Sequence, residues 1–374
     1  MTDGAIPAAA PFAGRSLTSL AMRRLFRNRA AVASLLVLAL VAIVCAVGPL
    51  FSRHGYDVIY QSYVRTPPSL EPYPRAGTLA AVMKNAADLA RVTVAGFDVA
   101  GGAFTVTLAS ETPIDPRTTR YIDRTDEFEN ARVAETRDGG RTLVVAGTVA
   151  REYFLMGTDA NGRDLLTRIM IGGRISLTVG ILATLVSLLV GVAYGAISGF
   201  AGGRVDNVMM RLVEILYSLP FVFLVIVLVV FFGRNFVLIF VAIGAIEWLD
   251  MARIVRGQTL SLKRREFVAA AEAMGVSNWQ IVRRHIVPNT VGPVIVFVTV
   301  LVPKVILLES FLSFLGLGVQ EPLTSWGALI AEGAAGMQAA PWLLIFPSIF
   351  FVATLMSLNF LGDGLRDAFD PRDR

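Results

Sequence analysis

Long apolar runs are the feature of this sequence that most restricts its fold. The clearest, AAVASLLVLALVAIVCAVGPLF at 30–51, has 22 residues and no charge. A helix needs about 20 mostly apolar residues to cross the hydrocarbon core of a bilayer, where every backbone polar group must be satisfied internally. Further runs of roughly that length lie at 175–200, 212–233, 235–253, 290–315 and 340–361. The sequence therefore predicts an all-α polytopic membrane protein with about six transmembrane helices.

The composition supports this class and excludes several others. Hydrophobic residues make up 55% of the chain and charged residues 17%, whereas a soluble chain has about 25% charged residues. One Cys and two His leave no disulfide within the chain and no Cys- or His-based metal cluster, so we expect neither metal nor cofactor. No G-x-x-x-x-G-K-[ST] or G-x-S-x-G motif occurs, which argues against an ATPase, a hydrolase or any other enzyme.

Charge placement predicts the topology. Arg23, Arg24, Arg27 and Arg29 precede the first run, and basic residues outnumber acidic ones across 251–289. Because cytoplasmic loops carry the excess of Lys and Arg, both segments are expected in the cytoplasm, and an even number of spans returns the C-terminus there. This gives the domain boundaries that we expect: a cytoplasmic tail at 1–29 (disordered over 1–14), a first helix at 30–51, an outside loop at 52–152, a core at 153–361 with a cytoplasmic loop at 254–289, and a cytoplasmic tail at 362–374.

The outside loop contains a small α+β module. It has 13 acidic and 12 basic residues over 52–152, so it lacks the cytoplasmic bias. TLAAVMKNAADLARV is apolar on one face at helical spacing, and VTVAGFDVAGGAFTVTLAS alternates around Gly-Gly as a hairpin does. ARVAETRDGGRTLVVAGTV predicts a second strand pair with its turn at Asp138-Gly139-Gly140.

A polar stretch between two apolar runs, REFVAAAEAMGVSNWQIVRRHIVPN at 265–289, stands out from its surroundings. Its alanines favour a helix that stops at Gly275. Ser277 is typical of the cap of a second helix, which we expect to end near Pro288.

Three interpretations of this stretch are open. A DNA-binding helix-turn-helix is disfavoured by the membrane spans on both sides, so no nucleic acid partner is expected. The stretch is either a loop whose charges only set topology or a docking surface for another protein. Small side chains allow close approach and larger apolar ones offer anchors, which favours docking. The small residues are Ala269, Ala270, Ala271 and Ala273, and the anchors are Phe267, Val268 and Met274.

The stretch resembles the EAA loop of ABC-importer permeases: two alanines, three residues, a glycine, nine residues and a hydrophobic-Pro close. Ala270, Ala271, Gly275, Val287 and Pro288 fit this pattern. Ala269 stands where the motif has Glu, and His285 where an aliphatic residue is usual, although RHIVPN is typical of the peptide-permease branch. The resemblance implies a loop that couples to an ATPase through Phe267, Val268, Ala269, Ala270, Ala271, Met274, Gly275, His285 and Pro288.

Five further motifs extend the resemblance to the C-type permease subunit of oligopeptide ABC importers. They begin at Gly157, Gly202, Trp248, Glu309 and Asn359, so with the N-terminal part the similarity covers about 20–60 and 153–374. It implies a type I ABC importer fold with the outside module as an insertion. It also implies a multi-pass protein of the inner membrane, embedded in its lipid. The expected partners are a second permease, two cytoplasmic ATPase subunits, an extracytoplasmic solute-binding protein and a peptide substrate.

Two features of the spans are candidates for the gate or pathway. SFLGLG at 313–318 ends a span with alternating glycines, so Ser313, Phe314, Gly316 and Gly318 are either a plain helix terminus or an outer gate that rearranges. Charges inside a span are costly and usually face a cavity or partner. Glu309 is therefore a pathway candidate, whereas Lys304, about 140° away on the helix, is expected to snorkel.

Other functions are left open by the residues alone. Similar permeases carry dipeptides, nickel chelates or related small solutes instead of oligopeptides. A self-sufficient secondary transporter needs its own ion site, and the few acidic residues in the spans weigh against it. A sensor or assembly protein would instead bind its ligand through the outside module.

Overall fold

The computed structural model describes residues 17–233 and 236–369. The tail predicted as disordered over 1–14 and the last residues, 370–374, lie outside the described residues. The chain divides into two compact units. The first unit comprises 1–41, 177–309 and 352–374, and the second unit comprises 42–176 and 310–351.

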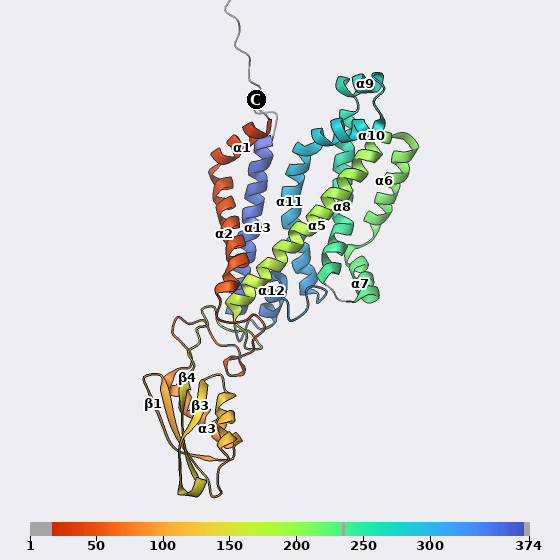
Figure 1. The fold of residues 1–374 in the computed structure, drawn as a ribbon. Helices are drawn as coiled ribbons and strands as arrows, with labels where there is room; N and C mark the ends of the chain where they lie inside the picture. The colour runs from red at the N-terminus through yellow and green to blue at the C-terminus, as the bar shows by residue number, and fades with distance from the viewer. Residues whose placement is uncertain (1–16, 234–235, 370–374) are drawn as a thin grey trace, which may run out of the picture. The chain divides into compact units, whose positions relative to one another are not determined.

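Helices dominate both units (Figure 1). They are α1 (Leu17–Arg27), α2 (Arg29–Phe51), α3 (Ala76–Leu89), α4 (Thr119–Asp123), α5 (Leu165–Ala201), α6 (Gly203–Ser218), α7 (Phe221–Phe232), α8 (Phe236–Leu262), α9 (Glu266–Ala273), α10 (Asn278–Ile281), α11 (Val287–Phe314), α12 (Trp326–Ala335) and α13 (Trp342–Phe369). The strands are β1 (Thr93–Ala100), β2 (Ala103–Ala109), β3 (Phe128–Arg137) and β4 (Thr142–Val149).

Within the described residues, four helices are long and apolar enough to cross a membrane. They are α2, α5, the continuous helix from Asn278 to Phe314, and α13; the bent pair α6–α7 makes a fifth if it is one span. The fourth predicted span, 235–253, forms as α8 but is less apolar than the others because Glu247, Asp250 and Arg253 lie within it. This confirms the helical membrane class and reduces the number of strongly apolar spans from about six to four or five.

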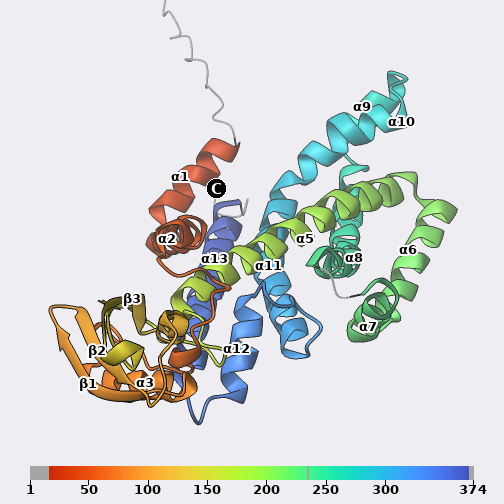
Figure 2. The ribbon, with the colours of Figure 1, turned by 60° about the horizontal axis from the view of Figure 1, so that its bottom comes forward.

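The predicted span at 212–233 is not one straight helix. α6 and α7 meet at 83° across Leu219 and Pro220, a bend that can be followed in Figure 2. Leu219 has ψ 126° and Pro220, the N-cap of α7, has ψ 123°, so both residues are extended. A residue before proline is pushed out of the helical region, which explains the break.

Three glycines hold α5 against α8 in the first unit. Gly191, Gly195 and Gly199 are four residues apart and so lie along one face of α5. A Cβ would lie 2.5 Å from Cβ of Met251 at the first position and 2.9 Å from the carbonyl oxygen of Arg256 at the third. Lipid provides no hydrophobic force between helices, so close backbone packing of small residues is what holds such helices together.

The outside module in the second unit folds as predicted. Its sheet has the order β1-β2-β4-β3, with every neighbouring pair antiparallel. The hairpin turns fall at Gly101-Gly102 and at Asp138–Gly140, where the residues have positive φ. The buried face of the sheet packs on α3, and the core includes Leu79, Met83, Phe104, Val106, Leu143 and Val145. The module therefore has its own hydrophobic core.

The two ends of the module lie side by side. Tyr73 and Glu152 form an antiparallel bridge, with N–H to carbonyl distances of 2.8 and 2.9 Å. The segment around Ser62 adds two bonds to the module, to the carboxylates of Asp126 at 2.7 Å and Glu127 at 3.0 Å. The ends of the inserted segment are therefore already adjacent.

We expect the module to be separable from the helices. A chain in which 75–150 are replaced by a short Gly-Ser linker should insert into the membrane and retain its thermal unfolding temperature within a few degrees. The measurement is a thermal-shift assay on the purified full chain and the shortened chain in the same detergent. Failure of the shortened chain to accumulate in membranes would show that the module is needed for folding.

Candidate functional site

The polar stretch forms two short helices joined by a tight turn in the first unit. α9 ends as predicted: N–H of Val276 donates to the carbonyl of Ala271 at 3.1 Å, and N–H of Gly275 donates to that of Glu272 at 3.0 Å. These two bonds, with Gly275 at φ 77°, define a Schellman motif. The oxygen of Ser277 then accepts the N–H of Gln280 and caps α10, also as predicted.

One face of this helical pair packs on the membrane helices. Val268 and Ala271 of α9 are buried in a core with Ile281 and Ile286, and with Met251 of α8. The predicted docking role of Val268 therefore needs correction. Its side chain is 0% exposed, so it anchors α9 in the core and cannot contact a partner. Ala271, at 2%, has the same place in the core.

The opposite face is exposed and apolar. Phe267 is 41% exposed, Met274 76% and Trp279 64%. Ala269 and Ala270 are exposed beside them, and nothing in the chain comes within 4 Å of a Cβ built on Gly275. We call these six residues the exposed α9–α10 face. Large apolar side chains around small residues are what a docking surface for another helix requires.

The expected end of the second helix near Pro288 is wrong. Residues Val282–Ile286 form a π-helical turn, and the helix runs on through Pro288 to Phe314. A proline inside an α-helix removes one N–H and crowds the carbonyl four residues earlier, and a widened turn relieves both. The side chain of Asn289 donates to the carbonyl of His285 at 2.6 Å, which gives that carbonyl a partner. The half-buried His285 ring lies 6.3 Å from that of Phe267.

The SFLGLG segment ends α11 in the second unit with another Schellman motif. N–H of Leu317 donates to the carbonyl of Leu312 at 2.9 Å, and N–H of Gly316 to that of Ser313 at 3.0 Å. A Cβ on Gly318 would overlap Ser313, whose hydroxyl lies 3.2 Å from that of Ser325. This geometry is that of a packed helix terminus, and the role of the segment as a gate stays a prediction. Phe314, 60% exposed, and Leu315, 45% exposed, present apolar side chains that could contact another molecule.

The charges inside the spans of the first unit are paired differently from expectation. Lys304, expected to snorkel, instead forms ion pairs. Its Nζ lies 2.8 Å from the carboxylate of Glu247 and 3.2 Å from that of Asp250, both on α8. Glu309 is fully buried, so it does not line an open path in this conformation. Its role in the pathway stays a prediction.

A cluster of ion pairs lies in the second unit, around the loop before α5. Nε of Arg163 lies 2.7 Å from Asp159, which also pairs with Arg168. The two arginines reach on to Glu321 at 2.7 Å and Glu332 at 2.8 Å. Asp159 and both arginines are less than 5% exposed. The cluster therefore ties the loop before α5 to the segment around α12.

Asp164, close to this cluster in the sequence, caps α5. Its carboxylate accepts the backbone N–H of Thr167 at 2.8 Å and its hydroxyl at 2.6 Å. Burial raises the pKa of Asp164, and the bonds from Thr167 oppose that rise.

A second ion pair, between a buried carboxylate and a half-buried arginine, was missed from the sequence. Nε and Nη2 of Arg256 each lie 2.6 Å from a carboxylate oxygen of Asp206, which also accepts the hydroxyl of Ser198. These residues join α8, α6 and α5 of the first unit. Both residues lie in segments that carry other charges, and nothing in the local sequence indicates that these two meet.

Two family models match separate parts of the chain. Residues 191–374 match the family described as binding-protein-dependent transport system inner membrane component. Residues 16–68 match the N-terminal TM domain of oligopeptide transport permease C.

Curated relatives extend this similarity. The oligopeptide transport system permease protein OppC of Escherichia coli (strain K12) is 48% identical over 361 residues, which cover 96% of this chain and 93% of that protein. This chain belongs to the C-type permease family of oligopeptide and dipeptide ABC importers. OppC of Haemophilus influenzae is 59% identical to this permease over 232 residues, covering 62% of this chain and 75% of that protein. The dipeptide transport system permease protein DppC of Bacillus subtilis (strain 168) is 47% identical over 219 residues, covering 58% and 68%.

Membership confirms the predicted fold class and the predicted place of this permease as a multi-pass protein of the inner membrane. The relatives named above are transport permease subunits. The permease therefore acts as a component of a transporter.

We expect the buried Asp159 cluster to determine stability. Asp159→Asn leaves two buried arginines without their shared carboxylate and should cost roughly 3–5 kcal/mol. Glu214→Gln is the matched control, because Glu214 pairs with Arg211 on the surface at 3.2 Å and such pairs contribute little. Thermal unfolding of both variants in one detergent is the measurement. Equal unfolding temperatures for the two variants would contradict a structural role for the cluster.

Proposed function

We propose that this permease forms, with a second homologous permease, the translocation path for oligopeptides across the inner membrane. The relatives named above are oligopeptide and dipeptide permeases, which supports a peptide cargo. Two cytoplasmic ATPase subunits drive the movement and an extracytoplasmic solute-binding protein delivers the peptide. The chain contributes no covalent chemistry to transport.

The observation that carries this proposal is the exposed α9–α10 face. It presents Phe267, Met274 and Trp279 on a short segment whose other face is anchored among α8 and α11 through Val268 and Ile286. Large exposed apolar side chains grouped on one surface mark an interaction site. We propose that an ATPase subunit docks here, so that its movement is passed to the spans.

Charge placement supports the orientation that docking requires. The segment 251–289 and the residues before α2 are rich in arginine, which supports a cytoplasmic location for both and for the two termini. The near-neutral stretch 52–152 then lies outside, where the binding protein delivers its cargo.

Gly275→Val should uncouple the ATPases from the permease. Valine is strained at φ 77°, and its side chain would project from the exposed α9–α10 face, where space is open in the free chain. Gly233→Val is the matched control, because Gly233 has φ 75° and open space but lies at the end of α7. The measurement is a pull-down of the ATPase subunits at matched membrane levels of permease, followed by uptake of a labelled oligopeptide.

A second pair of variants separates docking from backbone strain. Phe267→Ser and Met274→Ser change only exposed side chains, so they should weaken ATPase capture several-fold while leaving thermal stability unchanged. If all of these variants capture ATPase and transport like the wild type, the segment is only a topological loop.

The cargo is tested by competition. In membranes that contain the complete importer, unlabelled oligopeptides of four or five residues should compete with labelled oligopeptide uptake more strongly than dipeptides do. Stronger competition by dipeptides or by a nickel chelate would assign the permease to one of those transport classes, with the ATPase-docking results unaffected.

A further inference from the structure

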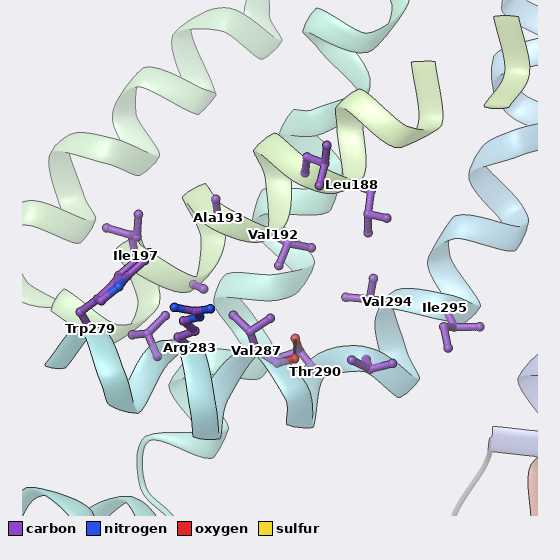
Figure 3. Close-up of a pocket in the computed structure, with 14 residues that line it drawn as sticks. Leu188, Val192, Ala193, Ile197, Trp279, Arg283, Val287, Thr290, Val294 and Ile295 are labelled. Carbon is purple, nitrogen blue, oxygen red and sulfur yellow. Dashed lines mark hydrogen bonds between the residues drawn. The ribbon is translucent and has the colours of Figure 1, made fainter. Parts of the chain in front are cut away.

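An apolar groove of about 430 Å³ lies between α5 and the continuous helix α10–α11, all within the first unit (Figure 3). From α5 its walls include Leu189, Ala193 and Ile197, and from the other helix Trp279, Arg283 and Val291. The volume is within the roughly 300–1,000 Å³ of small-molecule sites. The walls on α5 are exposed, so the groove opens outward from the helix pair.

A single charge stands in this groove. Arg283 is the only charged lining residue, and Figure 3 shows its guanidinium beside Trp279, turned toward α5. Within the described residues, Arg283 has no acidic partner in an ion pair. The hydroxyl of Thr290, the other polar lining group, donates to the carbonyl of Val287 at 2.8 Å. The groove therefore offers one unpaired cation at the end of an apolar wall.

This chemistry restricts the occupant. A peptide or sugar would leave its polar groups without partners against valine and leucine side chains, which is costly. A phospholipid with an anionic headgroup matches both parts: its acyl chain covers the apolar wall and its phosphate accepts hydrogen bonds from the guanidinium. Basic pockets between membrane helices on the cytoplasmic side bind anionic lipid headgroups in this manner.

We propose that this groove is a binding site for one anionic phospholipid, with the phosphate on Arg283 and an acyl chain along α5 and α11. Trp279, 64% exposed at the rim, has the amphipathic ring that favours the headgroup level of a bilayer. Lipid is the solvent of these helices, so the acyl chain reaches the groove without a delivery step. Binding of the lipid does not require a docked ATPase.

The test is native mass spectrometry of the full-length permease, purified in mild detergent and incubated with phosphatidylglycerol or phosphatidylethanolamine. Wild type should retain one phosphatidylglycerol in preference to phosphatidylethanolamine. Arg283→Gln should lower that retention about fivefold, the effect of losing one basic side chain near an anionic headgroup. Arg284→Gln is the matched control, because Arg284 is the adjacent exposed arginine and does not line the groove.

Two further measurements distinguish a lipid in the groove from a lipid bound elsewhere on the helices. Ala193→Phe fills the groove from an exposed position and should lower retention with Arg283 intact. Brominated phosphatidylglycerol should quench the tryptophan fluorescence of the wild type more than that of Trp279→Phe. Soluble glycerol phosphate should not prevent this quenching, because it lacks the acyl chain.

Several outcomes would overturn the proposal. One is an equal loss of lipid in Arg283→Gln and Arg284→Gln, which indicates general charge attraction. Another is unchanged retention in both Arg283→Gln and Ala193→Phe. A third is loss of the lipid from wild type when the second permease binds, which would assign the groove to the contact between permeases.

Discussion

Close backbone contact between α5 and α8 is the constraint on which the rest of the first unit depends. Helices in lipid gain nothing from leaving water, so they associate through packing and polar contacts. Gly191, Gly195 and Gly199 allow the backbones to meet, and the paired Asp206 and Arg256 add a charge-assisted contact beside them. Larger side chains at these three positions would separate α5 from α8 and disrupt the surface against which α9 packs.

The proposed docking surface takes its rigidity from this packing. α9 follows α8 after a short turn, and Val268 and Ala271 lie in one core with Met251 of α8 and Ile286 at the start of α11. A displacement of α9 relative to α8 would have to disturb this core, which is costly in a densely packed interior. A docked ATPase would therefore move the two helices together with α9.

Sequence reasoning succeeded where the controlling physics is local. The stop at Gly275, the cap at Ser277 and the turn at Asp138–Gly140 each depend on a few neighbouring residues, and all three are present. It failed at Pro288, because the π turn that admits this proline is set by a helix that continues for about seven turns beyond it.

Contacts between distant segments could not be predicted from the sequence, because they too depend on residues that are not neighbours in the chain. The residues that pair with Lys304 lie more than 50 positions away, and helix periodicity carries no information about them. The bend at Pro220 had a local signal, but the apolar character on both sides of it hid the break. The candidate site was thus found by motif and resemblance. Which of its residues are buried and which are exposed could be seen only from the packing of the structure.

Trp279 and Arg283 lie one turn apart on the same helix, and this joins the two proposed surfaces. Trp279 belongs to the exposed α9–α10 face and also to the rim of the groove. If an ATPase contacts the Trp279 ring and shifts that ring relative to the groove, the affinity of the groove for a lipid on Arg283 changes as well. Linkage then requires the reverse effect of equal size: an anionic lipid in the groove must alter the affinity of the permease for its ATPase by the same factor. The composition of the membrane would thereby act on coupling through α10, at a distance from the translocation path itself.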